Sequence, residues 1–173
     1  MVSTELIVDF VNTAGFGPDR ENLPTPAALV DWLEAHGLQP GPKASRRSYL
    51  AALEVREALR DLLSSHNDVE VDVDAAIDVL DGAARRARLE VCFAEQTGRV
   101  EPHSEGVSGA IGRILAEVYV AMATGEWQRL KACRADDCRY AFYDSARNRS
   151  RAWCSMQVCG NRAKVQTYRA RHH

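Results

Sequence analysis

The stretch that decides the fold is the basic run KACRADDCRYAFYDSARNRSRAWCSMQVCGNRAKVQTYRAR, residues 131–171. It contains four cysteines in two close pairs, Cys133-x4-Cys138 and Cys154-x4-Cys159, separated by fifteen residues. In a four-thiolate zinc site, each pair brings two sulfurs to one side of the ion and the loop between the pairs closes the tetrahedron. Because four thiolates fill the coordination sphere, we expect one structural Zn²⁺ per chain, with no open position for a catalytic water.

The remaining cysteine, Cys92, lies far from this run. The N-terminal stretch has no basic region and carries Glu5 and Asp9, so it is unlike a secretory signal and we expect a cytoplasmic protein. Structural disulfides are rare in the cytosol, which favours metal ligation over two disulfides or four unrelated thiols. No Cys-His-Asn signature surrounds Cys92, which is predicted to be a partly buried, inert thiol. The terminal His172 and His173 receive no role.

Composition and charge limit the classes of partner that this protein is expected to bind. The 173 residues are 46% hydrophobic and 27% charged, as in a globular protein, and no run of about 18 apolar residues predicts a membrane span. Residues 1–126 hold 11 basic and 21 acidic side chains, a net charge of −10, whereas residues 127–173 hold 11 and 3, a net charge of +8. A basic tail on an acidic body indicates a polyanionic partner for the tail, or a tail that folds back onto the body. The two are not exclusive.

The acidic body is predicted to be mostly helical. Apolar side chains recur at a helical period in five segments: residues 3–11, 26–36, 45–66, 72–87 and 107–123. Ser3, Thr25 and either Asp72 or Asp74 are the expected N-caps. Between the last two segments, residues 88–94 alternate at strand period and lead into a Gln-Thr-Gly turn, which predicts a hairpin with Cys92 on the face opposite the apolar side chains.

The basic tail is predicted to be a separate small unit. Residues 139–144 indicate a strand, residues 145–151 a turn with three arginines, and residues 160–171 a helix. Trp153, Phe142 and Tyr143 are its expected core, and Val165 and Tyr168 are expected to turn one face of the helix toward the zinc. This order of elements is a treble clef. Because the tail has few apolar residues, it cannot fold by burial of a core alone. Zinc is therefore expected to supply much of its stability.

The fold class is therefore α+β. We predict a mostly helical body with a small β element over residues 1–126, joined near Gly125 to a C-terminal treble-clef zinc finger over residues 127–173.

The string Cys159-Gly160-Asn161-Arg162, with its lead-in Arg149-Ser-Arg-Ala-Trp-Cys154, resembles the CGNR zinc finger. The opening LIVDFVNT (6–13) and the helix beginning at Pro26 resemble the start of an ABATE domain. Ala152 departs from the pattern, since a second arginine is expected beside Trp153. The resemblance covers the whole chain and implies a bacterial, stress-induced transcription regulator with an α+β body followed by a treble-clef finger.

Four functions compete. The leading hypothesis is a transcription regulator whose finger binds double-stranded DNA, with the body sensing a ligand or oligomerising. The alternatives are a protein-interaction module, an RNA-binding protein that stacks bases on its aromatic residues, and an enzyme, which is disfavoured because no open metal site or paired acid/base motif is present. The expected nucleic-acid contacts are Arg147, Arg149 and Arg151 in the loop and Arg162, Lys164 and Arg169 on the helix.

A small-molecule effector is a further expectation for the body. Asn12 and Thr13, followed by a polar loop with Arg20, lie near Trp32 in the sequence. These residues are candidates for the lining of a small-ligand pocket. A helix cap and a turn are the competing interpretation of the same residues. A homo-oligomer is compatible with the sequence, and no membrane partner is expected.

Overall fold

The computed structural model describes residues 4–15, 21–94 and 97–171. Within them the helices are α1 (Thr4–Val11), α2 (Pro26–Ala35), α3 (Arg46–Ser65), α4 (Val73–Ala87), α5 (Gly106–Ala123) and α6 (Asn161–Arg171), with short turns η1 (Trp127–Arg129) and η2 (Met156–Gly160). The strands are β1 (Leu89–Ala94), β2 (Thr97–Pro102), β3 (Leu130–Ala132) and β4 (Ala141–Tyr143). They form two antiparallel pairs, β1 with β2 and β3 with β4. The α+β class is confirmed.

Local signals set most helix starts. The side chains of Thr25, Ser45 and Asp72 each accept a hydrogen bond from the backbone N–H three residues on, at the starts of α2, α3 and α4. These bonds satisfy donors that the first turn of a helix leaves unpaired. The predicted caps at Thr25 and Asp72 are confirmed, and Ser3 lies outside the described residues.

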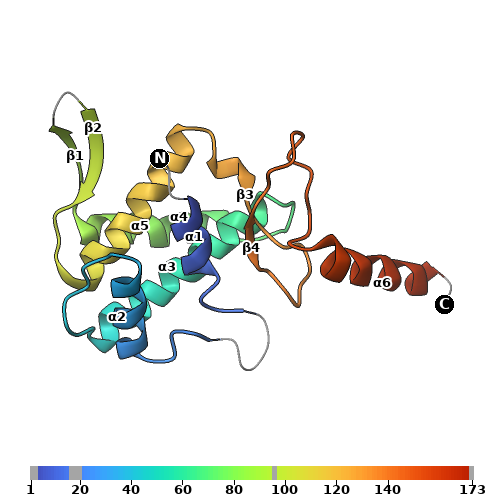
Figure 1. The fold of residues 1–173 in the computed structure, drawn as a ribbon, viewed down its shortest axis with the longest axis horizontal. Coiled ribbons are helices and arrows are strands. Elements are labelled where there is room, and N and C mark those ends of the chain that lie inside the picture. The colour runs from blue at the N-terminus through green and yellow to red at the C-terminus, as the bar shows by residue number, and fades with distance from the viewer. Residues whose placement is uncertain (1–3, 16–20, 95–96, 172–173) are drawn as a thin grey trace.

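The core forms around α3, the longest helix, which packs against α1, α2, α4, α5 and β3. Leu59 and Leu63 of α3 are fully buried, together with Phe10 of α1 and Ile114 of α5. Figure 1 shows α3 running through the centre of the body with the other helices around it.

The β1–β2 hairpin contacts α5 through β2, and its far end extends outward from the body (Figure 1). Its register pairs Leu89 with Pro102 and Phe93 with Gly98. Leu89 packs against the main core, but Val91 and Phe93 are 58% and 84% exposed and Cys92 is half-buried. The alternation therefore predicted the strand correctly, whereas its apolar face has no cover within the described residues.

The β3–β4 hairpin joins the tail to the body. Leu130, Ala132 and Ala141 are fully buried in the main core and not in a separate finger core. The strand predicted over residues 139–144 is shorter, because Arg139 has a positive φ of 46° and breaks the extended run. The division after residue 126 stays a prediction, but the first strands of the tail share the core of the body.

Helix α6 extends away from the rest of the molecule (Figure 1). Val165 and Tyr168 are 49% and 63% exposed, so the expected packing of this helix onto the zinc core is wrong. Among the described helices, α5 is long and apolar enough to cross a membrane by length and composition, but half of it is buried within the fold. It serves as a core helix of the body.

Candidate metal centre and the surrounding basic surface

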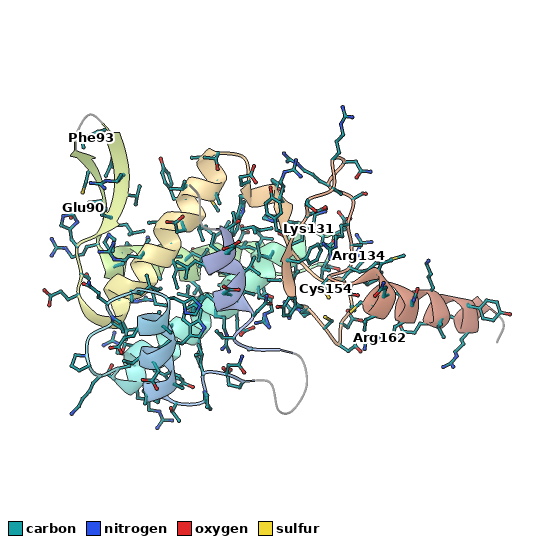
Figure 2. The ribbon with its side chains drawn as sticks, in the orientation of Figure 1. Glu90, Phe93, Lys131, Arg134, Cys154 and Arg162 are labelled. Carbon is teal, nitrogen blue, oxygen red and sulfur yellow. The ribbon has the colours of Figure 1, made fainter. Side chains whose placement is uncertain are left out.

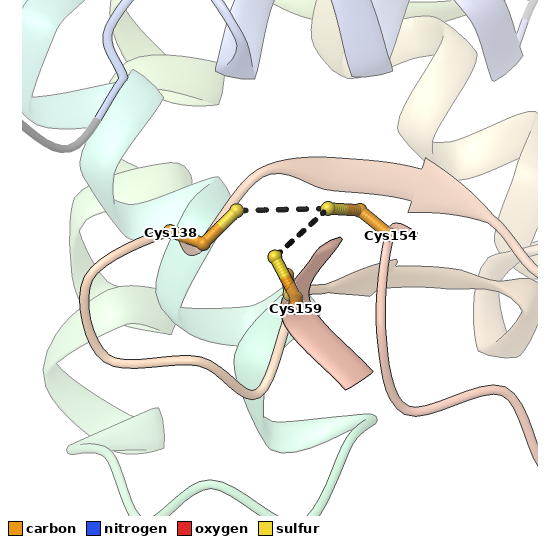
Figure 3. A group of neighbouring side chains, drawn as sticks. Cys138, Cys154 and Cys159 are labelled. Atoms are coloured by element: carbon orange, nitrogen blue, oxygen red, sulfur yellow. Dashed lines mark hydrogen bonds between the residues drawn. The ribbon is translucent and has the colours of Figure 1, made fainter. Parts of the chain in front are cut away.

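The four tail cysteines converge on one point. Their sulfur atoms all lie within 4.8 Å of one another. The Sγ atoms of Cys138 and Cys154 are 3.6 Å apart, and those of Cys154 and Cys159 are 3.8 Å apart (Figure 3). A tetrahedral Zn²⁺ with bonds of about 2.3 Å to sulfur separates its ligands by about 3.8 Å, so these two separations are those that the ion requires. The four cysteines hold one structural zinc.

Backbone hydrogen bonds near each cysteine hold the thiols in position. Cys133 directly follows β3, and its N–H donates to the carbonyl of Tyr140 across the hairpin. Cys138 lies on a turn, and its own N–H donates to the carbonyl of Ala135. Cys159 lies in η2, two residues before the start of α6, and Ser155 caps η2. The prediction that the start of the last helix supplies the last thiolate is right to within one turn, and the treble-clef classification stays a prediction.

The thiols differ in acidity. Burial raises the pKa of Cys138 to about 11 and also raises the pKa of Cys154 above its ordinary value. Burial acts in the same direction on Cys159, but hydrogen bonds from Arg162 and from the neighbouring cysteines together outweigh it and lower the pKa of Cys159. Because a metal binds thiolates, it must displace protons from the other thiols, and zinc affinity falls as the pH falls.

Arg162 serves the metal centre. One of its guanidinium nitrogens is 3.4 Å from the Cys159 sulfur, and another pairs with the carboxylate of Asp137. Figure 2 shows Arg162 beside the start of α6, close to Cys154. Its guanidinium thus has two partners at the metal centre, where it positions Cys159 and balances the charge of the thiolates, and its DNA contact stays a prediction.

Arg151 is also committed inside the finger. Its guanidinium donates to the backbone carbonyls of Trp153 and Cys154 and stacks 4.8 Å from the ring centre of Phe142. Of the predicted finger core, Phe142 is buried and Trp153 is half-buried, but Tyr143 is exposed. Arg151 therefore closes the loop over this small core, and its phosphate contact stays a prediction.

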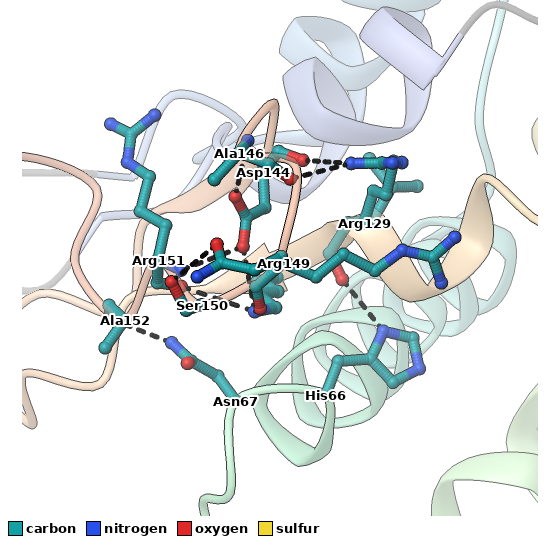
Figure 4. Close-up of polar contacts among 12 residues, drawn as sticks. His66, Asn67, Arg129, Asp144, Ala146, Arg149, Ser150, Arg151 and Ala152 are labelled. Carbon is teal, nitrogen blue, oxygen red and sulfur yellow. Dashed lines mark hydrogen bonds and ion pairs between the residues drawn. The ribbon is translucent and has the colours of Figure 1, made fainter.

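A buried ion pair organises the arginine loop. The Nζ of Lys131 lies 2.9 Å from an oxygen of Asp144, whose side chain is completely buried. The Asp144 carboxylate also accepts from the N–H groups of Ala146 and Arg151, and Lys131 donates to the carbonyl of Arg149 (Figure 4). Burial alone would raise the pKa of Asp144, but these hydrogen bonds outweigh it and lower the pKa. No sequence pattern predicts this role of Asp144.

Polar side chains of the body hold the finger in place. Asn67 donates to the carbonyls of Ala132 and Ala152, at 2.7 and 2.8 Å. Arg134 pairs with Asp68, and Arg139 pairs with Asp61. Figure 2 places Lys131 and Arg134 where the tail meets the body. Part of the basic tail thus does fold back onto the acidic body, as the competing interpretation of the charge asymmetry required.

The residues considered for a small-ligand pocket have structural roles. The side chain of Asn12 donates to and accepts from the backbone of Ala141, at 3.0 and 2.8 Å, and so extends the edge of β4. Thr13 is buried and accepts from Arg56, while the half-buried Trp32 stacks on His36. Arg20 lies outside the described residues. Asn12, Thr13 and Trp32 thus have partners within the fold, and the small-ligand pocket stays a prediction.

Two arginines in the middle of α3 were missed by sequence reasoning. Arg56 forms a bidentate pair with Glu21, and Arg60 donates to the backbone carbonyls of Val11 and Ala14. Both side chains are almost completely buried. Their spacing of four residues on the apolar face of a helix was the available signal, because a cation in that position must find an acceptor.

His66 lies at the junction of body and tail. Its ring nitrogen is 2.8 Å from the carbonyl oxygen of Leu130, and Trp127 meets the ring edge-on. Burial lowers the pKa of His66 below its ordinary 6.5, although the bond to Leu130 opposes the shift.

This shift predicts a pH dependence of stability. Because the pKa of His66 is lower in the folded protein, the unfolded chain takes up this proton first as the pH falls. The free energy of unfolding should therefore decrease as the pH drops through about 6.5, and His66→Gln should remove this component. Urea unfolding of both proteins with saturating zinc, between about pH 8 and about pH 5.5, measures the difference. Parallel pH profiles would contradict the prediction.

All six predicted nucleic-acid residues are exposed. Arg151 and Arg162 have the partners described above, which leaves Arg147, Arg149, Lys164 and Arg169. Within the described ranges, none of these four side chains forms an ion pair or a side-chain hydrogen bond. Two lie in the loop held by Asp144 and two on α6, the helix that projects away from the acidic body (Figure 1).

Comparison with known families agrees with this architecture. Residues 4–126 match the ABATE family, described as "Putative stress-induced transcription regulator".

The chain belongs to the ABATE family.

The tail of this ABATE protein, residues 129–172, matches the CGNR zinc finger. A comparison with curated proteins gave no match. The resemblance noted from the opening LIVDFVNT (6–13) and from residues 159–162 is thereby confirmed. The family description supports a regulator of transcription and names no enzymatic activity.

Proposed function

We propose that this ABATE protein is a non-enzymatic transcription regulator that binds duplex DNA through its zinc finger. The observation that supports this most strongly is the set of exposed cations without partners, Arg147 and Arg149 on the loop and Lys164 and Arg169 on α6. Eleven helical residues span about 16 Å, and a helix of that size enters the major groove.

The finger presents these cations on rigid supports. The loop is held by the buried Lys131–Asp144 pair, and the start of α6 is held by the zinc through Cys159. Contacts from Arg and Lys to phosphates position a protein on DNA without specifying the sequence. The adjacent exposed Gln166 is the side chain on this helix best suited to read an adenine edge.

Salt dependence tests the proposal. With four cations contacting phosphates, the logarithm of the binding constant for a random-sequence duplex should fall with the logarithm of salt at a slope of about −3.6. Lys164→Gln and Arg169→Gln should each flatten this slope by about one unit, whereas Arg85→Gln, in the body, should leave it unchanged. Fluorescence anisotropy of a labelled duplex measures each slope. No binding at low salt with zinc in place would contradict the proposal.

A protein-interaction module is the second candidate, because apolar side chains are exposed on the same part of the tail. Met156, Val158, Val165 and Tyr168 are each about half exposed or more. A partner protein that covers these residues would bind with little salt dependence. The salt series therefore separates the two functions.

A further inference from the structure

A pocket of about 750 Å³ lies between α3, α4 and α5 of the body, away from the metal centre and from the residues first considered for a ligand. Its floor is apolar, formed by the buried side chains of Ala52, Val55, Val107 and Ile111. Pockets for small molecules in proteins have volumes of about 300 to 1,000 Å³ and mostly apolar walls. The pocket has the size and the lining of a small-ligand site.

The rim of this pocket is cationic. Arg46 and Arg47 reach it from the first turn of α3, and Arg86 reaches it from α4. In the part of the chain that the structure describes, none of these three guanidinium groups forms an ion pair or a hydrogen bond. The neighbouring Arg85, which does not line the pocket, is paired with Asp81. Three unpaired cations are notable in a body whose net charge is −10.

The opposing charge at the pocket is small. Glu54 is the acidic side chain in its lining, so the lining carries a net positive charge. The first turns of two long helices, α3 and α5, also line the pocket, with Ser48 and Ser108. The partial positive charge at these helix ends adds to the field of the arginines.

We propose that this pocket binds a small organic carboxylate with an apolar body. Guanidinium groups match the planar geometry of a carboxylate with two parallel hydrogen bonds, and the apolar floor accommodates the hydrocarbon part. A volume of about 750 Å³ suits a small molecule better than a chain of nucleic acid or protein. The site would give the body a sensing role, and it does not depend on DNA binding by the finger.

Calorimetry with the zinc-loaded full chain tests the proposal, with naphthoate as the probe and neutral naphthamide as its uncharged counterpart. We expect saturable binding of naphthoate at one site per chain and much weaker binding of naphthamide. Arg47→Gln and Arg86→Gln should each weaken naphthoate binding about tenfold, because a charge-assisted hydrogen bond is lost. Arg85→Gln, the matched control on α4, should leave it unchanged.

A second variant tests the location without changing a charge. Ala51 is half-buried and lines the pocket, so Ala51→Leu should reduce naphthoate binding by filling the space. Circular dichroism checks that each variant is folded. The proposal is overturned if naphthoate does not bind, if naphthamide binds equally well, or if Arg47→Gln and Arg86→Gln both bind like Arg85→Gln.

Discussion

Cys159→Ser should reduce the zinc content from one ion per chain to none and release the end of the tail from the body. A serine hydroxyl does not replace a thiolate, and zinc contributes about 10 to 16 kcal/mol to the folding of small zinc fingers. Elemental analysis of the purified protein measures the zinc, and limited proteolysis locates the released segment. We expect cleavage within residues 145–171, beyond β4.

Cys92→Ser is the matched control, because Cys92 lies on the β1–β2 hairpin, away from the metal centre. It should retain one zinc and the proteolytic pattern of the parent protein. One zinc retained in Cys159→Ser would refute the four-cysteine ligand set. Strong chelation should have the same effect as Cys159→Ser and leave the helices of the body folded. Cooperative unfolding of the entire chain would show that β3 and β4 make body and finger one unit.

Asp144→Ala should lower the free energy of unfolding by about 3 to 5 kcal/mol, because it leaves the ammonium group of Lys131 buried without its counter-charge. The N–H groups of Ala146 and Arg151 lose their acceptors as well. Urea unfolding with zinc present measures the loss. Asp136→Ala, an exposed carboxylate in the same tail, serves as the control and should change stability by less than about 0.5 kcal/mol.

The sign of the pH dependence follows from the lowered pKa of Asp144. A depressed carboxylate pKa stabilises the folded protein above the ordinary value of 3.8, and this contribution is lost as the pH falls through the lower folded pKa. Loss of stability in Asp144→Ala should therefore be full near neutral pH and shrink in strong acid. Equal effects of Asp144→Ala and Asp136→Ala near neutral pH would show that the buried pair is unimportant.

The sequence alone was sufficient for the metal ligands and most helix limits. Two cysteine pairs with four intervening residues each specify a tetrahedral site, because the ligands within a pair are close along the chain. Thr25 and Asp72 predicted helix starts for a similar reason, since an N-cap bonds to a backbone group only three residues away. Strand period also located β1 correctly.

The partners of individual side chains could not be predicted in this way. Asn12 pairs with Ala141, 129 residues further along the chain, and no local pattern marks that contact. Arg151 and Arg149 are two residues apart in one loop and both are exposed, yet the guanidinium of Arg151 is bonded within the finger and that of Arg149 has no partner among the described residues. The alternation in β1 likewise showed which side chains share a face, but not whether that face would be covered.

The sequence by itself determined the zinc site, the helical body and the opposite charges of body and tail, because these depend on residue type and short spacing. Only the tertiary structure decided which cations are free, where the tail attaches and where a ligand pocket opens. Each of these depends on contacts between elements far apart in the chain. The pocket is the clearest case, because Arg47 and Arg86 become neighbours only when α3 packs against α4.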